Sequence, residues 1–377
     1  MLTNAPLWCW FAPPEGHPLP SAHRVALGLP GLGLHIPNRL HWRIEPLAGW
    51  HLPLLGDPAF LPLQAQLQRA ALLAMPARML AWLAGDRKLP PQVLVAFGEH
   101  SQTALGLVLS RPLNRSGSCW QIQHLRTTRA DVRQPLSCDL LKAALSRVNA
   151  SSWVAAAACD DRIRLAVLRE LGFQPLRQDQ LWCWDPISPT QIQPEAPSNE
   201  LQLRPLNRRT ANQLWHLEQT VCPAQLRQVL DRRVEDLLDQ SQGQGWLLVD
   251  PSRGIAVAGL RWLGEHPGGG HDLELSVDPG WQHLYGPWCA VLLQRMVQTL
   301  GSEQPLWLRS DPDDSNRQSW LRAMQAQPRS ERVLMARTIW RRQPLPTARS
   351  QTSRGLEAVL AQLQPGRRPV PTPLVRR

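Results

Sequence analysis

The chain of 377 residues contains one tyrosine, four phenylalanines and only two lysines, Lys88 and Lys142. Its positive charge is therefore almost entirely arginine, and its aromatic residues are mostly the 17 tryptophans. No apolar run approaches the roughly 18 residues that a membrane-spanning helix needs, which argues against a membrane protein. No lysine or arginine precedes Arg24, and prolines interrupt the apolar start, so it does not resemble a signal peptide. We expect a cytoplasmic protein.

The cysteines do not occur in the patterns that are typical of disulfide frameworks or zinc sites. The seven cysteines are odd in number, and none forms a Cys-x-x-Cys pair. This argues against a disulfide framework and against a zinc site, so we expect free thiols and no bound metal. The acidic pairs Asp160-Asp161 and Asp313-Asp314 could suggest a metal, but each precedes a helical pattern, where carboxylates cap helix starts.

The net charge of +11 is concentrated at one end. From Arg341 onward there are eight arginines and one acid, a net +7 that leaves +4 for the rest of the chain. A short tail rich in arginine and proline is typical of disorder. Nucleic-acid binding through this tail is the least favoured of the functions considered, and a steep loss of affinity with salt would reveal it.

The sequence repeats itself at an offset of about 153 residues, which indicates a duplicated domain. The matching segments, in the same order in both copies, are Val93–Val95 with Trp246–Leu248, Gly106-Leu107 with Gly259-Leu260, and Asp160-Asp161 with Asp313-Asp314. The expected organisation is an extension 1–41, a first copy 42–186, a linker 187–199, a second copy 200–344 and a disordered tail 345–377.

Both copies predict the same order of elements, β-αα-β-β-β-α-β-α-β. The turn residues that separate the elements are less clear in the first copy. In the first copy we expect strands at 42–46, 92–97, 104–110, 120–125, 152–158 and 174–184, and helices at 61–85, 135–148 and 161–171. In the second we expect strands at 201–205, 245–249, 255–262, 273–277, 306–309 and 333–340, and helices at 209–218, 223–239, 287–300 and 315–326. This order predicts an α/β protein in which each copy is a mixed sheet covered by helices.

Two segments resemble a known family. Asp160-Asp161 leads to Leu168–Phe173, which ends in Gly-Phe, and the strand ending at Val277 is followed by a loop and a helix after Gly286. These features resemble the GNAT N-acetyltransferase superfamily. The resemblance covers nearly all of both copies and implies transfer of an acyl group, such as acetyl, from acyl-coenzyme A to an amine.

The loop before that helix would hold the cofactor pyrophosphate, which is bound by backbone N–H groups at a helix start. Close approach of backbone to an anion favours glycine, and only one glycine of the family pattern is present here. Pro287 also removes one donor, and the corresponding first-copy segment, 132–137, has no glycine. The resemblance therefore places acetyl-CoA in the second copy. The residues expected to bind it are Val277, Gln282, His283, Tyr285, Gly286, Trp288 and, on the late helix, Asn316.

A base is expected on the strand before the loop, because the attacking amine must lose a proton. Glu274 is the candidate, with Asp272 and Ser276 on the same face by strand alternation. The alternative is a surface acid paired with an arginine. The corresponding first-copy residues, Gln121 and Gln123, cannot act as bases. The family's late-helix tyrosine is missing.

The leading hypothesis is a tandem GNAT-type N-acyltransferase in which the second copy binds acyl-CoA and the first is a degenerate scaffold. The alternative is an inactive tandem protein with a binding or scaffolding role. The acceptor, a small-molecule or peptide amine, is not specified by the sequence. The protein could be a monomer or a homodimer. The segment His266–Gly270 resembles a hydrolase oxyanion loop, but no nucleophile turn accompanies it, so we expect a hairpin turn.

Overall fold

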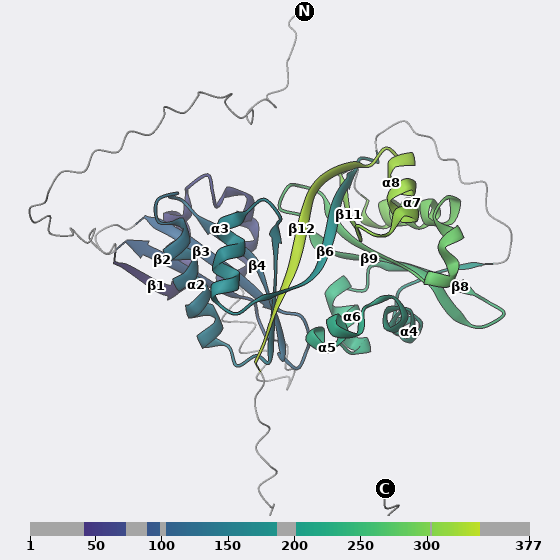
Figure 1. The fold of residues 1–377 in the computed structure, drawn as a ribbon, viewed down its shortest axis with the longest axis horizontal. Helices are drawn as coiled ribbons and strands as arrows, with labels where there is room; N and C mark the ends of the chain where they lie inside the picture. The colour runs from purple at the N-terminus through teal and green to yellow at the C-terminus, as the bar shows by residue number, and fades with distance from the viewer. Residues whose placement is uncertain (1–40, 73–88, 99–102, 187–200, 302–303, 340–377) are drawn as a thin grey trace, which may run out of the picture. The chain divides into compact units, whose positions relative to one another are not determined.

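The computed structural model of the protein describes residues 41–72, 89–98, 103–186, 201–301 and 304–339 (Figure 1). The expected linker and tail, Trp340, and the extension before His41 lie outside the described residues. So does the final part, 73–85, of the helix expected at 61–85, of which the structure describes a 3-10 turn, Leu61–Leu63, and helical residues 64–72.

The first repeat, residues 42–186, has the expected order of elements. Its strands are β1 Trp42–Pro46, β2 Gln92–Gly98, β3 Ala104–Pro112, β4 Cys119–Thr127, β5 Ser152–Ala158 and β6 Gln174–Trp184. Its helices after the 3-10 turns Gly49–Leu55 and Leu61–Leu63 are α2 Arg133–Arg147 and α3 Arg162–Glu170.

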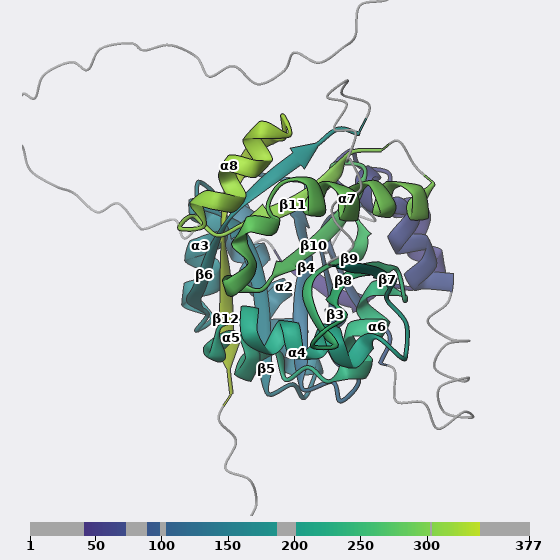
Figure 2. The ribbon, with the colours of Figure 1, turned by 90° about the vertical axis from the view of Figure 1, so that its right-hand side faces the viewer.

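The second repeat, described over residues 201–301 and 304–339, has the same order of elements. Its strands are β7 Gln202–Pro205, β8 Gly245–Asp250, β9 Ile255–Glu265, β10 His271–Val277, β11 Leu306–Ser310 and β12 Gln327–Thr338. Its helices are α4 Ala211–Val221, α5 Ala224–Leu230, α6 Val234–Ser241, α7 Pro287–Leu300 and α8 Ser315–Ala323, with a 3-10 segment Pro279–Leu284 before α7. Figures 1 and 2 place α7 and α8 on one side of β8–β11, and α4, α5 and α6 on the other.

The strands of both repeats form one twelve-stranded mixed sheet, in the order β1-β2-β3-β4-β5-β12-β6-β11-β10-β9-β8-β7. The last strand of each repeat is exchanged. Strand β12 lies between β5 and β6 and is antiparallel to both, while β6 pairs with β11 of the second repeat (Figure 1). The sequence predicts a sheet for each repeat and gives no sign of this exchange.

The exchanged strands complete the two hydrophobic cores. Val333 and Met335 of β12 are buried in the core of the first repeat, beside Trp153. Trp182 of β6 is buried in the core of the second repeat, where its indole N–H donates a hydrogen bond of 2.9 Å to Ser310. Each core therefore depends on a segment from the other repeat.

The acidic pairs cap helices, as the sequence predicts. Asp161 accepts a 3.0 Å hydrogen bond from the backbone N–H of Arg164 at the start of α3, and Asp314 accepts one of 3.0 Å from Arg317 at the start of α8. These bonds satisfy backbone donors that have no partner within the helix. Among the described residues, no cluster of three or more histidine, cysteine, aspartate or glutamate side chains is placed to hold a metal ion.

Two expected boundaries are wrong. The helix expected at 223–239 is two helices, because Asp231 takes a left-handed conformation with φ 44° and ends α5. The last strand begins at Gln327, not 333, because its first residues pair with β6 across a register shift. The turn at His266–Gly270 joins β9 to β10 as a hairpin, as expected.

Candidate active site

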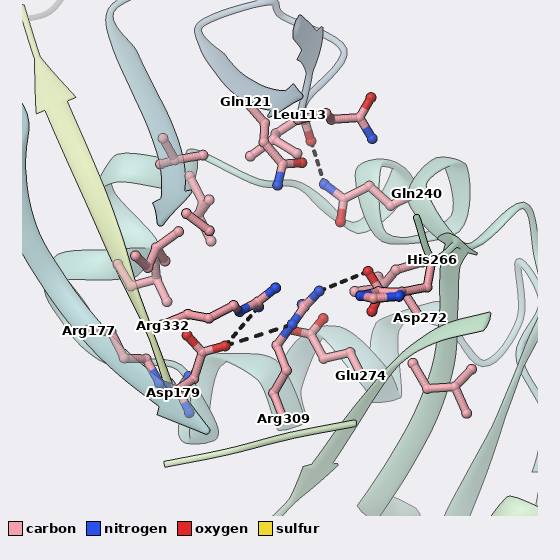
Figure 3. A pocket seen from close by; sticks show the side chains of 18 of the residues that line it. Leu113, Gln121, Arg177, Asp179, Gln240, His266, Asp272, Glu274, Arg309 and Arg332 are labelled. Carbon is pink, nitrogen blue, oxygen red and sulfur yellow. Dashed lines mark hydrogen bonds and ion pairs between the residues drawn. The ribbon is translucent and has the colours of Figure 1, made fainter. Parts of the chain in front are cut away.

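A cavity of about 400 Å³ is enclosed by residues of both repeats. We call it the central cavity. It is lined by parts of β3, β4, β5, β6, α3, α4, α5, α6, β9, β10, β11, α8 and β12. Figure 3 shows some of the lining side chains. Its volume is in the range of small-molecule sites, which is roughly 300–1,000 Å³.

The charged residues of the central cavity are mostly arginines. The arginines are Arg111, Arg126, Arg164, Arg177, Arg232, Arg309, Arg317 and Arg332. The acidic residues are Asp179, Glu218, Glu265, Asp272 and Glu274. Asp179 is central to a network, since it lies 3.0 Å from Arg332 and 3.8 Å from Arg309 (Figure 3). Arg309 also binds Asp272 at 3.0 Å. The cavity therefore has an excess of positive charge.

Glu274, the predicted base, lies on β10 with its side chain 32% exposed. It forms an ion pair with Arg261, which is opposite it in the β9–β10 register and almost wholly buried. Burial alone would raise the pKa of Glu274, but Arg261 first, and then Arg232 and Arg309, outweigh burial and lower that pKa to about 2. The carboxylate is therefore charged at neutral pH and faces the cavity.

The two residues predicted to share the face of Glu274 also line the cavity, and both are engaged in polar contacts. Ser276 donates a 2.7 Å hydrogen bond to Glu218 of α4. Asp272 binds Arg309 through one oxygen, while its Oδ1 is enclosed and has no hydrogen-bond partner. This face of β10 thus presents the carboxylates of Asp272 and Glu274, and one oxygen of Asp272 has no hydrogen-bond partner among the described residues.

Strands β10 and β11 are parallel neighbours only at their start. They pair at His271 with Leu306 and at Asp272 with Trp307, and pairing ends there. From Leu273 to Val277, β10 has only β9 as a hydrogen-bonded neighbour, so one edge of its backbone is unpaired. In the first repeat, β4 and β5 separate in the same way after Ile122 and Ala155.

The unpaired edge of β10 leads directly to the start of α7. Gly286 precedes this helix with φ 148°, a conformation that favours glycine, and no side chain caps the helix. Pro287 has no N–H, and the N–H groups of Trp288 and Cys289 have no backbone partner. Two unpaired donors and the positive end of the helix dipole therefore meet beside Gly286.

Two side-chain hydrogen bonds connect this loop to the start of α8. The Tyr285 hydroxyl donates to Asp314 at 3.1 Å, and the Asn316 amide donates to Gln282 at 2.6 Å. Burial, with Asp314 nearby, raises the pKa of Tyr285, so its hydroxyl stays protonated. Gln282, Tyr285 and Asn316 are thus brought together.

The remaining residues of the predicted cofactor set are spread along the same loop. Val277 is buried at the end of β10, and the His283 ring lies against Trp281 with 5.3 Å between ring centroids. Trp288 is partly buried against the core of the second repeat.

The first repeat differs at the corresponding helix start. A cleft of about 370 Å³ there is lined by Arg126, Arg129, Arg133 and Arg164. Arg133 binds Asp161 at 2.7 Å, and no glycine lies at the start of α2. The first repeat therefore has a basic cleft without the glycine that close approach of an anion favours.

Sequence reasoning missed the arginines of the central cavity. It considered the arginines mainly as net charge and as a basic tail. One signal was available, because Arg164 and Arg317 are 153 residues apart, the offset of the repeat, and both follow a capping aspartate. Arg261 was a second signal, since strand pairing places it opposite Glu274.

A solved tandem GNAT structure confirms the architecture, while a second match, with a TM-score below 0.5, is a likeness only. A tandem GNAT protein from the clavulanic acid biosynthesis pathway matches with a TM-score of 0.51 and 12% identity, over 80% of this chain and 100% of its own. A GCN5-related N-acetyltransferase from Sphaerobacter thermophilus matches with a TM-score of 0.47 and 13% identity, over 79% of this chain and 95% of its own. The chain therefore has the GNAT fold in two tandem copies, as the sequence predicts.

No family model matches the sequence, and no curated protein matches it. The helices of the described residues are all too short or too polar to span a bilayer.

Proposed function

We propose that this protein is an acyl-CoA-dependent N-acyltransferase whose second repeat holds acetyl-CoA or a related thioester. The observation that carries the proposal is the continuity of three features. The unpaired edge of β10, the uncapped start of α7 at Gly286 and the charged face of Glu274 belong to one strand–loop–helix segment.

Each part of that segment fits one part of the donor. The backbone of β10 up to Val277 is free to bond the amide groups of the pantetheine arm. The N–H groups of Trp288 and Cys289 suit the pyrophosphate, and Gln282, His283, Tyr285 and Asn316 lie in or against the loop around it. When bound, the thioester supplies an activated acyl group.

Glu274 is the residue that meets the acceptor amine in this proposal. With a pKa of about 2 it is a weak base, but its charge attracts and orients an ammonium group in the central cavity. The ammonium loses one proton to water before the neutral amine attacks the thioester carbonyl. Glu274 then takes the second proton from the nitrogen as the C–S bond breaks and coenzyme A leaves as the thiolate. Gln121 and Gln123, which correspond to the face of Glu274 on β4, cannot do this, so the first repeat has no carboxylate at the corresponding position.

Changing Gly286 to valine is expected to weaken acetyl-CoA binding by about ten-fold or more, measured by isothermal titration calorimetry. A Cβ at Gly286 meets no protein atom within 4 Å, so the added side chain occupies the space assigned to the phosphates. The matched control is Gly301→Ala at the other end of α7, where φ is 59° and a Cβ also meets nothing within 4 Å. The control loses stability but keeps its affinity. Equal affinities for both variants, or no heat from the unchanged protein at millimolar acetyl-CoA, would overturn the proposal.

Glu274→Gln is expected to lower kcat/KM by about 10²-fold or more, with the same factor at every pH from about 5 to about 9. The factor is constant because a carboxyl group with a pKa of about 2 is ionised throughout that range. Acetylation of a panel of amines, followed by release of free thiol, measures it. The rate of both proteins should rise with pH up to the pKa of the acceptor amine. If the pH–rate profile of the unchanged protein has an additional inflection at lower pH that the variant lacks, then Glu274 titrates near neutrality and this prediction is wrong.

A cytoplasmic location and a monomeric or homodimeric state stay predictions. No observation of the described residues favours the inactive alternative.

A further inference from the structure

Arg126 of the central cavity is exposed and has no carboxylate within ion-pair distance, and three less exposed arginines of the cavity wall also have none among the described residues. They are Arg111 of β3, Arg164 of α3 and Arg317 of α8. The Nε of Arg111 donates to Gln121 at 3.2 Å, and among the described residues no hydrogen bond or ion pair is found for its two terminal nitrogens. The Nε atoms of Arg164 and Arg317 are enclosed and have no hydrogen-bond partner. The other cavity arginines that are enclosed are paired with acids.

An enclosed charge without a partner is costly, and proteins normally pair or hydrogen-bond such groups. Burial, which is the largest effect, lowers the pKa of Arg111 and of Arg164 to about 10. Both side chains are still charged at neutral pH. The wall contributed by the first repeat therefore holds positive charge and hydrogen-bond donors that only a ligand or water can satisfy.

The face of β10 has the opposite character. Glu274 is a half-buried carboxylate, and Asp272 has an enclosed oxygen without a hydrogen-bond partner among the described residues (Figure 3). Arg309 and Arg261 neutralise these two acids only in part, because each arginine is shared with a second acid, Asp179 or Glu218. The cavity is thus polar from one side to the other, with acceptors on β10 and unpaired donors on the first repeat.

Resting on the proposed function, we infer that the acyl acceptor is a small amine that also carries a carboxylate, of the size of an acidic amino acid. Its nitrogen lies at Glu274, where the acyl group is delivered, and its carboxylate lies against Arg111 and Arg164. A bidentate guanidinium–carboxylate contact supplies both charge and orientation. A cavity of about 400 Å³ accommodates a ligand of this size. The two repeats are both needed for this site, since each contributes one of its two charged walls.

The test measures ligand binding by the full chain in the absence of any acyl donor. The probes are L-glutamate, glutarate and 1,5-diaminopentane, which share a five-carbon chain and differ in their charged groups. L-Glutamate and glutarate are expected to bind, and 1,5-diaminopentane is expected to show no binding up to about 10 mM. Tight binding of the diamine, or no binding of either carboxylate, would overturn the inference.

Matched variants test which residues bind the carboxylate end of the ligand and which bind the amine end. Arg111→Gln and Arg164→Gln should each weaken L-glutamate binding by about ten-fold or more, as expected for a hydrogen bond to a charged group. Arg111→Lys should retain part of the affinity and checks that the loss is not a folding effect. Glu274→Gln should weaken L-glutamate but not glutarate, because glutarate has no ammonium group for Glu274 to attract. The control is Arg295→Gln on the exposed face of α7, which should change nothing.

The two proposals fail in different ways. If a carboxylate binds through Arg111 and Arg164 but acetyl-CoA does not bind, the acyltransferase proposal fails and the anion site remains. If acetyl-CoA binds and Arg111→Gln leaves L-glutamate affinity unchanged, the acyltransferase proposal remains and the inference about the acceptor is wrong.

Discussion

Deleting residues 327–377 is expected to unfold both repeats, not only the second. The deletion removes β12, which is the hydrogen-bonded neighbour of both β5 and β6. It also removes Val333 and Met335 from the first core, where each lost large side chain costs about 2–5 kcal/mol. A domain of this size is stable by roughly 5–15 kcal/mol, so the combined loss exceeds what it can tolerate. Near-ultraviolet circular dichroism of the buried tryptophans and thermal unfolding measure the effect.

Two controls distinguish the effect of removing β12 from the effect of shortening or cutting the chain. Deleting residues 341–377, which follow the described part of the chain, should change Tm by no more than about 2 °C. Cutting a protease site placed in the 187–200 segment should leave the two fragments associated, because β6 and β12 hold them in one sheet. A cooperative unfolding transition in the 327–377 deletion would show that the first repeat folds without β12.

Arg261→Met is expected to destabilise the protein by about 3–5 kcal/mol, because it leaves enclosed carboxylates without their partner. Arg261 is 1% exposed and contacts Glu274, Glu218 and, at 3.0 Å, the Gln240 side chain. In this variant Glu218 still has Arg232 at 3.7 Å, so most of the lost stability comes from Glu274. Urea unfolding measures the change. The matched control is Arg253→Met on an exposed turn, where an ion pair of 3.8 Å to Asp250 is worth less than about 1 kcal/mol.

The pH dependence of stability gives an independent check on this pair. The folded-state pKa of Glu274 is about 2, below its ordinary value of 4.5. Its ionisation therefore stabilises the fold fully above about pH 4.5, and this contribution is lost as pH falls towards about 2. In Arg261→Met the pKa of Glu274 rises, so less stability is lost on acidification. The double variant Arg261→Met/Glu274→Gln should be less destabilised than the sum of the single variants, and simple additivity would exclude a direct interaction.

Much of the candidate site follows from local sequence. The strand that carries Glu274, the glycine before α7 and the capping roles of Asp161 and Asp314 are all properties of short segments. Their backbone conformations depend on residues within a few positions, so turn and cap residues reveal them. The electrostatic state of Glu274 does not follow in the same way. Its pKa depends on Arg261 in the adjacent strand and on Arg232 and Arg309 from elsewhere in the fold.

The sequence by itself determined the duplication, the order of strands and helices in each repeat, and the GNAT-like character of both copies. The duplication and the order of elements follow from periodicity, turn residues and internal similarity along the chain, whereas the GNAT-like character came from the resemblance of two segments to a known family. Only the tertiary structure decided that β6 and β12 change places and that arginines of one repeat face carboxylates of the other. β6 and β12 have similar positions at the end of each repeat, so the pattern of each strand is compatible with either neighbour. The choice between them is therefore made by how the two halves fit together in space, which no local pattern records.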